Sequence, residues 1–167
     1  MSVAHNYEAA RQLHADLMAL PNFRGLMFPE LFDNVSKSSS IEAAAGGTAC
    51  QIAVTPGGFE LANAGERAGG ALVDVSVLVY VFTSSQYASG PAENEAMDAL
   101  LLELAQVCCR FAYVPAGVVV SRRGEVAGIP ARLAGIVELD MVTEAGFTDK
   151  VAAKALSITL RINLSKP

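Results

Sequence analysis

The segment from Ala71 to Ser84 constrains the fold of this chain most, because its side chains alternate with a period of two. Such a period predicts a β-strand whose side chains point to two opposite faces. One face is an unbroken row of valines: Val73, Val75, Val77, Val79 and Val81. The other face begins polar and then becomes apolar, in the order Asp74, Ser76, Leu78, Tyr80 and Phe82. Half of this strand is therefore apolar on both faces.

The segment from Glu93 to Ala112 predicts the helix that covers the valine row. Its apolar residues recur at steps of three and four, which places them on one stripe of an α-helix. The stripe consists of Met97, Leu100, Leu101, Leu104, Val107, Cys108 and Phe111. Asn94 or Ser89 is the expected N-terminal cap. Because a strand face and a helix stripe each need an apolar partner, we expect the two to pack together.

A second amphipathic helix is predicted near the N-terminus, from Ser2 to Leu20. Asn6 or Ser2 is suited to cap it, and Pro21 is expected to end it. The apolar side of this helix consists of Tyr7, Ala10, Leu13, Leu17 and Leu20.

A β-hairpin is predicted before the valine strand. Thr48 to Thr55 forms its first strand, Pro56-Gly57-Gly58 its turn, and Phe59 to Ala62 its second strand. Two segments beside it, Asn34 to Gly47 and Asn63 to Gly70, have few apolar side chains. We expect both to be loops that are mobile in the free protein.

Three more strands are predicted after the central helix, at Val118–Ser121, Leu133–Thr143 and Ala155–Leu164. The pair Arg122 and Arg123 follows the first of them in a tight polar turn. Short links between strands favour antiparallel pairing. The predicted fold class is therefore α+β, with an antiparallel or mixed sheet and helices packed on one face, in a single domain over residues 1–167.

The composition is unusually apolar for a monomer, since 52% of residues are hydrophobic and only 17% are charged. The usual charged share is about 25%. We expect part of this excess to lie in subunit interfaces, with Leu78, Tyr80, Phe82 and Leu102 as the candidates. No membrane partner is expected, because the apolar runs are far shorter than the ~20 residues of a spanning helix. The N-terminus shows no basic region followed by an apolar one, which predicts neither secretion nor anchoring.

Residue types that carry chemistry are sparse and poorly spaced. His5 and His14 lie nine residues apart, which is not the one-turn spacing of two ligands on one metal. The pairs Gly57-Gly58 and Gly69-Gly70 lack the strand–loop–helix context of a phosphate-binding loop. The sequence therefore predicts no catalytic, cofactor-binding or metal-binding residues, and no cofactor.

The net charge of −5 argues against sequence-independent binding of nucleic acid, because such binding depends on clustered Lys and Arg. Arg122 and Arg123 are the exception, because an exposed basic turn can contact a phosphate or an acidic partner surface. A solvated turn explains them as well. The three cysteines, Cys50, Cys108 and Cys109, have no metal-ligand spacing, and we interpret them as reduced thiols in a cytoplasm.

The order of the elements is informative in its own right. An N-terminal helix ending in Leu17-Met18-Ala19-Leu20-Pro21 and a hairpin precede Val73–Thr83, Ala96–Phe111, Arg132-Leu133-Ala134-Gly135-Ile136, Glu138-Leu139-Asp140 and Leu156–Leu164. Over nearly the whole chain this order resembles the tail terminator, or tail completion, proteins of long-tailed bacteriophages, including the Mu-like prophage type.

The resemblance implies a structural virion protein that is not an enzyme. Such proteins form a homohexameric ring on the neck-proximal end of the tail tube, stop its growth and dock the head-proximal connector. The implied partners are further copies of the chain, the tail tube protein and a neck or connector protein, while DNA passes through the ring without specific binding. The implied location is the virion tail or neck, after synthesis in the bacterial host cytoplasm. Arg122 and Arg123 would contact the tube or connector. The carboxylates available for a neutral or acidic lumen are Asp74, Glu138, Asp140, Glu144 and Asp149.

Three alternatives remain open at this stage. The nearest is another neck or tail ring component, such as a head–tail connector or a tube subunit. The second is a small enzyme that uses Glu138 and Asp140, which share a strand face, although a solvated strand explains this pair equally well. The third is a cytoplasmic ligand-binding module.

Overall fold

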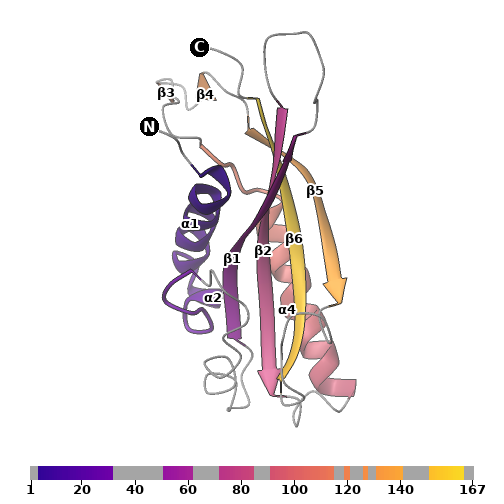
Figure 1. The fold of residues 1–167 in the computed structure, drawn as a ribbon. Coiled ribbons are helices and arrows are strands. Elements are labelled where there is room, and N and C mark those ends of the chain that lie inside the picture. The colour runs from indigo at the N-terminus through magenta and orange to yellow at the C-terminus, as the bar shows by residue number, and fades with distance from the viewer. Residues whose placement is uncertain are drawn as a thin grey trace.

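The computed structural model describes residues 4–31, 51–61, 72–84, 91–114, 119–120, 126–127, 131–140 and 151–163 (Figure 1). Its elements are, in chain order, α1 (His5–Met18), α2 (Pro21–Arg24), β1 (Gln51–Leu61), β2 (Leu72–Ser84), α4 (Pro91–Cys108), β3 (Val119–Val120), β4 (Val126–Ala127), β5 (Ala131–Asp140) and β6 (Val151–Asn163). Within these ranges, each helix is too short or too polar to cross a lipid bilayer.

Four of the strands form one antiparallel sheet in the order β1-β2-β6-β5, while β3 and β4 pair separately. Helix α1 contacts β1 and β2, and α4 contacts β6 and β2. Both helices contribute to the core cluster that contains the valine row of β2, so they cover the same face of the sheet (Figure 1). The predicted α+β class, with an antiparallel sheet and helices on one face, is confirmed.

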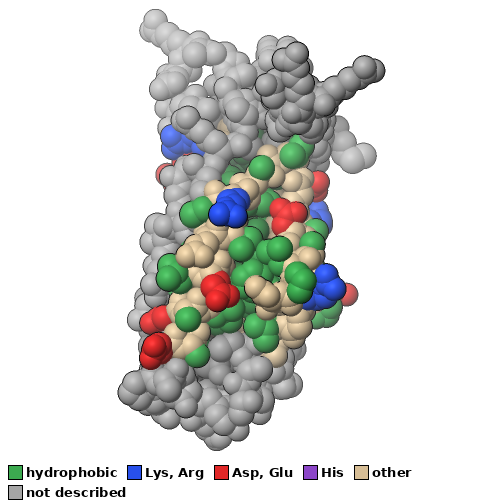
Figure 2. All heavy atoms as spheres, turned by 180° about the vertical axis from the view of Figure 1, so that it is seen from behind, with side chains coloured by type: hydrophobic (Ala, Val, Ile, Leu, Met, Phe, Trp, Pro, Cys, Tyr) green, Lys and Arg blue, Asp and Glu red, His purple; other side chains and the backbone are tan. Residues whose placement is uncertain are grey.

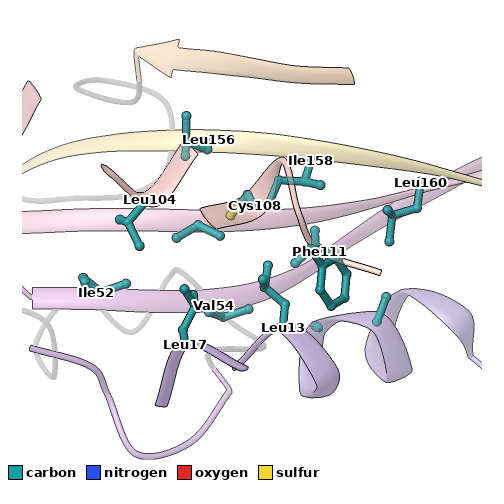
Figure 3. Close-up of a cluster of buried hydrophobic side chains, with 14 of the residues drawn as sticks. Leu13, Leu17, Ile52, Val54, Leu104, Cys108, Phe111, Leu156, Ile158 and Leu160 are labelled. Carbon is teal, nitrogen blue, oxygen red and sulfur yellow. The ribbon is translucent and has the colours of Figure 1, made fainter. Parts of the chain in front are cut away.

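The valine row lies at the centre of the core, as predicted, and all five of its members are buried. The strand register places it between the inward-facing residues of β1 and β6. Figure 3 shows side chains that close this cluster from the sheet and from the helices, among them Leu13, Leu17, Ile52, Val54, Leu104, Cys108, Leu156, Ile158 and Leu160. Each such burial contributes about 1.5–3 kcal/mol relative to exposure, so this layer holds the helices to the sheet.

The stripe of α4 is also confirmed in its centre. Met97, Leu101, Leu104 and Cys108 are buried, and Leu100 and Val107 are half-buried. The predicted ends of this helix were wrong. It begins at Pro91, which places Asn94 inside the helix instead of at its cap, and it ends at Cys108. Phe111 is buried in the segment that follows the helix.

The predicted hairpin at Pro56-Gly57-Gly58 was wrong, because β1 runs through these residues as one strand. Its register with β2 shifts between Pro56 and Phe59, which identifies a β-bulge that absorbs one extra residue. A Cβ on Gly57 would lie 2.7 Å from the Cβ of Ser76 and 2.8 Å from its carbonyl oxygen. Only glycine allows this approach without a shift, and proline is tolerated because β1 is an edge strand.

The N-terminal helix is shorter than predicted and begins without a side-chain cap. Its N-cap residue is Ala4. Asn6, the predicted cap, instead donates a hydrogen bond from Nδ2 to the carbonyl oxygen of Gly57 at 2.6 Å, which ties α1 to the bulge. Pro21 does not end α1 but stands at the first position of α2, where its missing N–H costs nothing. Tyr7 was placed in the core and is 37% exposed.

The segment after α2 closes part of the outer edge of β1. The Ile52 amide donates to the carbonyl of Leu26, and the Phe28 amide donates to the carbonyl of Ile52. Phe23 and Met27 are buried beneath this contact. The predicted mobile loops, Asn34–Gly47 and Asn63–Gly70, lie outside the described residues.

Candidate functional site

The sheet face opposite the helices contains the predicted interface residues of β2. Tyr80 lies between Ala53 and Ala155 in the register, and its exposed fraction is only 2%. Burial raises the pKa of its hydroxyl. Leu78 is half-buried, and the side chain of Phe82 is outside the described part. Tyr80 therefore has little surface left for another subunit, although the sequence placed it at an interface.

Four charged residues occupy one row across this sheet. The register aligns Glu60 of β1 with Asp74 of β2, Asp74 with Arg161 of β6, and Arg161 with Arg132 of β5. Arg161 donates from Nε to Asp74 Oδ1 at 2.8 Å and from Nη2 to Asp74 Oδ2 at 2.9 Å. This bidentate pair lowers the pKa of Asp74 and raises that of Arg161. Asp74, which was named as a carboxylate available for an acidic lumen, is thus already paired with Arg161.

Exposed apolar side chains lie on the two flanks of the molecule. Leu102 of α4, predicted as an interface residue, is 63% exposed. On the flank formed by β1, Phe59 is 73% exposed and Leu61 is 55% exposed. The sequence analysis missed these two residues because it placed them in a hairpin strand, although their position after a Pro-Gly-Gly bulge is typical of a sheet edge.

The outer surface of the helices, which lies behind the sheet in Figure 1, has apolar side chains at its centre with charged residues scattered among them (Figure 2). A groove of about 590 Å³ lies there between α2 and α4, and Leu20, Phe23, Glu103, Val107 and Arg110 are among the residues that line it. Apolar and charged groups are mixed along it, which suits a contact with a protein surface.

Two cysteines lie at the C-terminal end of α4, where Cys108 is the last residue of the helix and Cys109 follows it. Cys108 is buried and Cys109 is exposed. Burial raises the pKa of the Cys108 thiol to about 12, with a smaller contribution from Cys109. Cys108 is thus a core residue rather than a nucleophile. Cys50 lies outside the described residues.

Both histidines make structural contacts. The His5 Nδ1 atom lies 2.6 Å from the Tyr113 hydroxyl, and the His14 Nε2 atom lies 2.9 Å from the Phe28 carbonyl oxygen. Burial lowers the pKa of His5, partly opposed by Glu8, and raises that of Tyr113 to about 12. Across the part of the chain that the structure covers, no three His, Cys, Asp or Glu side chains lie close enough together to hold a metal ion.

The remaining predicted site residues are only partly placed. Arg122 and Arg123 lie outside the described residues, between β3 and β4, which pair with each other. On β5, Glu138 is registered opposite Leu156 and Asp140 opposite Lys154. Lys154 in turn forms a salt bridge with Asp98 of α4. The use of Glu138 and Asp140 as an acid/base pair, or as carboxylates of a lumen, stays a hypothesis.

Comparisons with known proteins give little further guidance. No protein-family profile and no curated protein matches the sequence. Among solved structures, a chain described as "Virion of native gene transfer agent (GTA) particle" aligns over 99% of this chain and 100% of its own length, with 16% identity and a TM-score of 0.40. At this TM-score the two chains cannot be said to share a fold.

Proposed function

We propose that this chain is a structural subunit of a phage-like tailed particle, and not an enzyme. The observation that carries the proposal is the placement of the three most exposed large apolar side chains among the described residues, with Phe59 and Leu61 on the edge strand β1 and Leu102 on α4. A subunit with apolar side chains on two flanks is suited to pack between two neighbours, as in a ring.

Within such a particle, we assign the chain to the tail terminator. The support is the order of its elements, which resembles that family over nearly the whole chain, together with the α+β fold and the net charge of −5. A hexameric ring of this subunit caps the tail tube, stops its growth and joins it to the head-proximal connector. Genomic DNA passes through without specific binding, because an acidic subunit offers few phosphate contacts.

The residues assigned to this role come from α4, from the central strand β2 and from the basic turn. Leu102, with Leu78 and Phe82, contributes to contacts between subunits. Tyr80 contributes through the sheet that it stabilises, since its own side chain is buried. Arg122 and Arg123 contact the tube or the connector, where one turn repeated around a ring gives many weak contacts at high effective concentration.

Deletion of the gene tests this function. Without the terminator, particles should separate into free heads and tails of irregular, excessive length, and expression of the chain in trans should restore joined particles of uniform length. Joined particles with normal tails in the deletion strain would contradict the proposal. Absence of all tail tubes would instead identify a tube subunit, and normal-length tails without heads would identify a connector.

A further inference from the structure

The two edges of the four-stranded sheet differ in what they offer to another molecule. Within the described strands, β1 and β5 are the outer strands. The Ile52 end of β1 is closed by the segment 26–28. Beyond the bulge, Phe59 pairs with Val75 and Leu61 with Val73, in the same alternation that pairs Ile52 with Val81. The amide and carbonyl groups of Phe59 and Leu61 therefore point outwards, as those of Ile52 do.

The charged row across the sheet has a direction. It runs from acidic at the β1 edge to basic at the β5 edge, in the order Glu60, Asp74, Arg161 and Arg132. Two copies joined β1 to β1 about a two-fold axis at this row would place Glu60 opposite Glu60, and two joined β5 to β5 in the same way would place Arg132 opposite Arg132. Only a β1-to-β5 contact brings opposite charges together at the seam.

The apolar side chains favour the same arrangement. Phe59 and Leu61 flank Glu60 at the β1 edge and are both largely exposed. At the other flank, Asp98 of α4 is bonded to Lys154 of β6, while Glu103 and Val107 line the side of α4 that faces α2. Leu102 lies one turn after Asp98 on the same side of the helix. The β1 flank thus presents two exposed apolar side chains and the α4 flank presents one, and each is suited to a contact with a second copy.

We propose that copies of this chain associate head to tail, with the β1 edge at Phe59, Glu60 and Leu61 of one copy against the β5 edge at Arg132 of the next. This inference names the contact between neighbouring copies in the proposed ring. It rests on the proposed function only in that the row of copies closes into a ring. The contact joins two different surfaces, so it closes into a ring when the rotation between copies closes and otherwise continues as a filament.

A charge-swap experiment tests the contact in the full-length chain. The mass of the assembly is measured by native mass spectrometry and analytical ultracentrifugation over a series of protein concentrations. Glu60→Arg and Arg132→Glu should each raise the dissociation constant at least tenfold, while the double variant should return it to within a few fold of the unchanged protein. Glu103→Arg makes the same charge change at an exposed position on the side of α4 that faces α2, away from either sheet edge, and should have no effect. Circular dichroism checks that each variant is folded.

Several outcomes would overturn the inference. The inference fails if the unchanged chain stays monomeric at its highest soluble concentration. It also fails if the double variant has a dissociation constant as high as those of the single variants. If the assembly tolerates Glu60→Arg but dissociates in Leu102→Glu, the copies associate through α4 and not through the sheet edges. If the charge swap succeeds and the gene deletion leaves normal particles, the head-to-tail contact stands and the terminator function fails.

Discussion

A methyl group added at Gly57 should destabilise the protein, whereas the same change at Gly58 should not. In Gly57→Ala the new Cβ would lie 2.7 Å from Ser76 Cβ, 2.8 Å from Ser76 O and 3.1 Å from Ser76 C. Carbon atoms pack best at about 3.5–4.0 Å, so β1 and β2 must move apart by several tenths of an ångström. The obstructing atoms include backbone of a central strand, which has buried valines on either side of Ser76.

The magnitude follows from two opposing effects. Overpacking of this kind costs about 1–3 kcal/mol, and a shift of the bulge also weakens the bond from Asn6 to the Gly57 carbonyl. Replacing glycine reduces the entropy of the unfolded chain and returns about 0.4–1 kcal/mol. We therefore expect a net loss of about 2 kcal/mol for Gly57→Ala, which lowers the melting temperature of a domain of this size by roughly 4–8 °C.

Gly58→Ala is the matched control, because a Cβ there meets nothing within 4 Å. Its stability should be unchanged or raised by at most about 1 kcal/mol. Both variants are compared with the unchanged chain by urea and thermal unfolding at one protein concentration, so that assembly does not confound the result. Equal stabilities of the two variants would refute the account of the bulge.

The other predictions concern the core, the interface, a histidine and the basic turn. Leu104→Ala should lower the free energy of unfolding by about 2–5 kcal/mol, measured by urea unfolding, and a loss below 1 kcal/mol would show that this side chain is not in the core. Leu102→Glu should leave the monomer folded and block assembly; intact rings in ultracentrifugation would rule out Leu102 as a contact. Burial lowers the pKa of His5 below 6.5, so the unfolded chain takes up the proton first, and stability should be full above pH 6.5 and fall as the pH drops towards the folded-state pKa. His5→Gln should flatten this fall, and an unaltered pH dependence would exclude His5 as its source. Arg122 and Arg123 changed together to Ala should weaken tail joining in a reconstitution assay, most clearly at low salt, where charge contacts are least screened. Duplex DNA binding that disappears in this variant would identify a phosphate contact instead.

The sequence was sufficient for the features that depend on local period. The valine row and the centre of the α4 stripe were predicted residue by residue, because a strand and a helix place apolar side chains at fixed intervals. The sequence was not sufficient at Pro56-Gly57-Gly58, where the same residues suit a tight turn and a bulge in a continuous strand. Whether these residues form a turn or a bulge depends on how β1 pairs with β2, and a local sequence pattern does not specify that pairing.

Contacts between distant segments were also beyond the sequence analysis. Tyr80 was assigned to an interface, yet its cross-strand neighbours are the small residues Ala53 and Ala155, and it is buried. Asp74 was named as a lumen carboxylate, and its partner Arg161 was missed because it lies 87 residues further along the chain. Asn6 was taken as a helix cap, while its amide reaches the bulge. Each of these depends on strand register or helix docking rather than on the residue's own segment.

The position of the chain on the particle tests the proposed function most directly. Purified tailed particles that carry an epitope-tagged copy of the chain should be labelled with gold-conjugated antibody and viewed by electron microscopy. The account predicts label at one site on each particle, where the tail tube meets the head, and the same single site at one end of isolated tails. Label along the whole tail, on the head shell, or on no particle at all would contradict it.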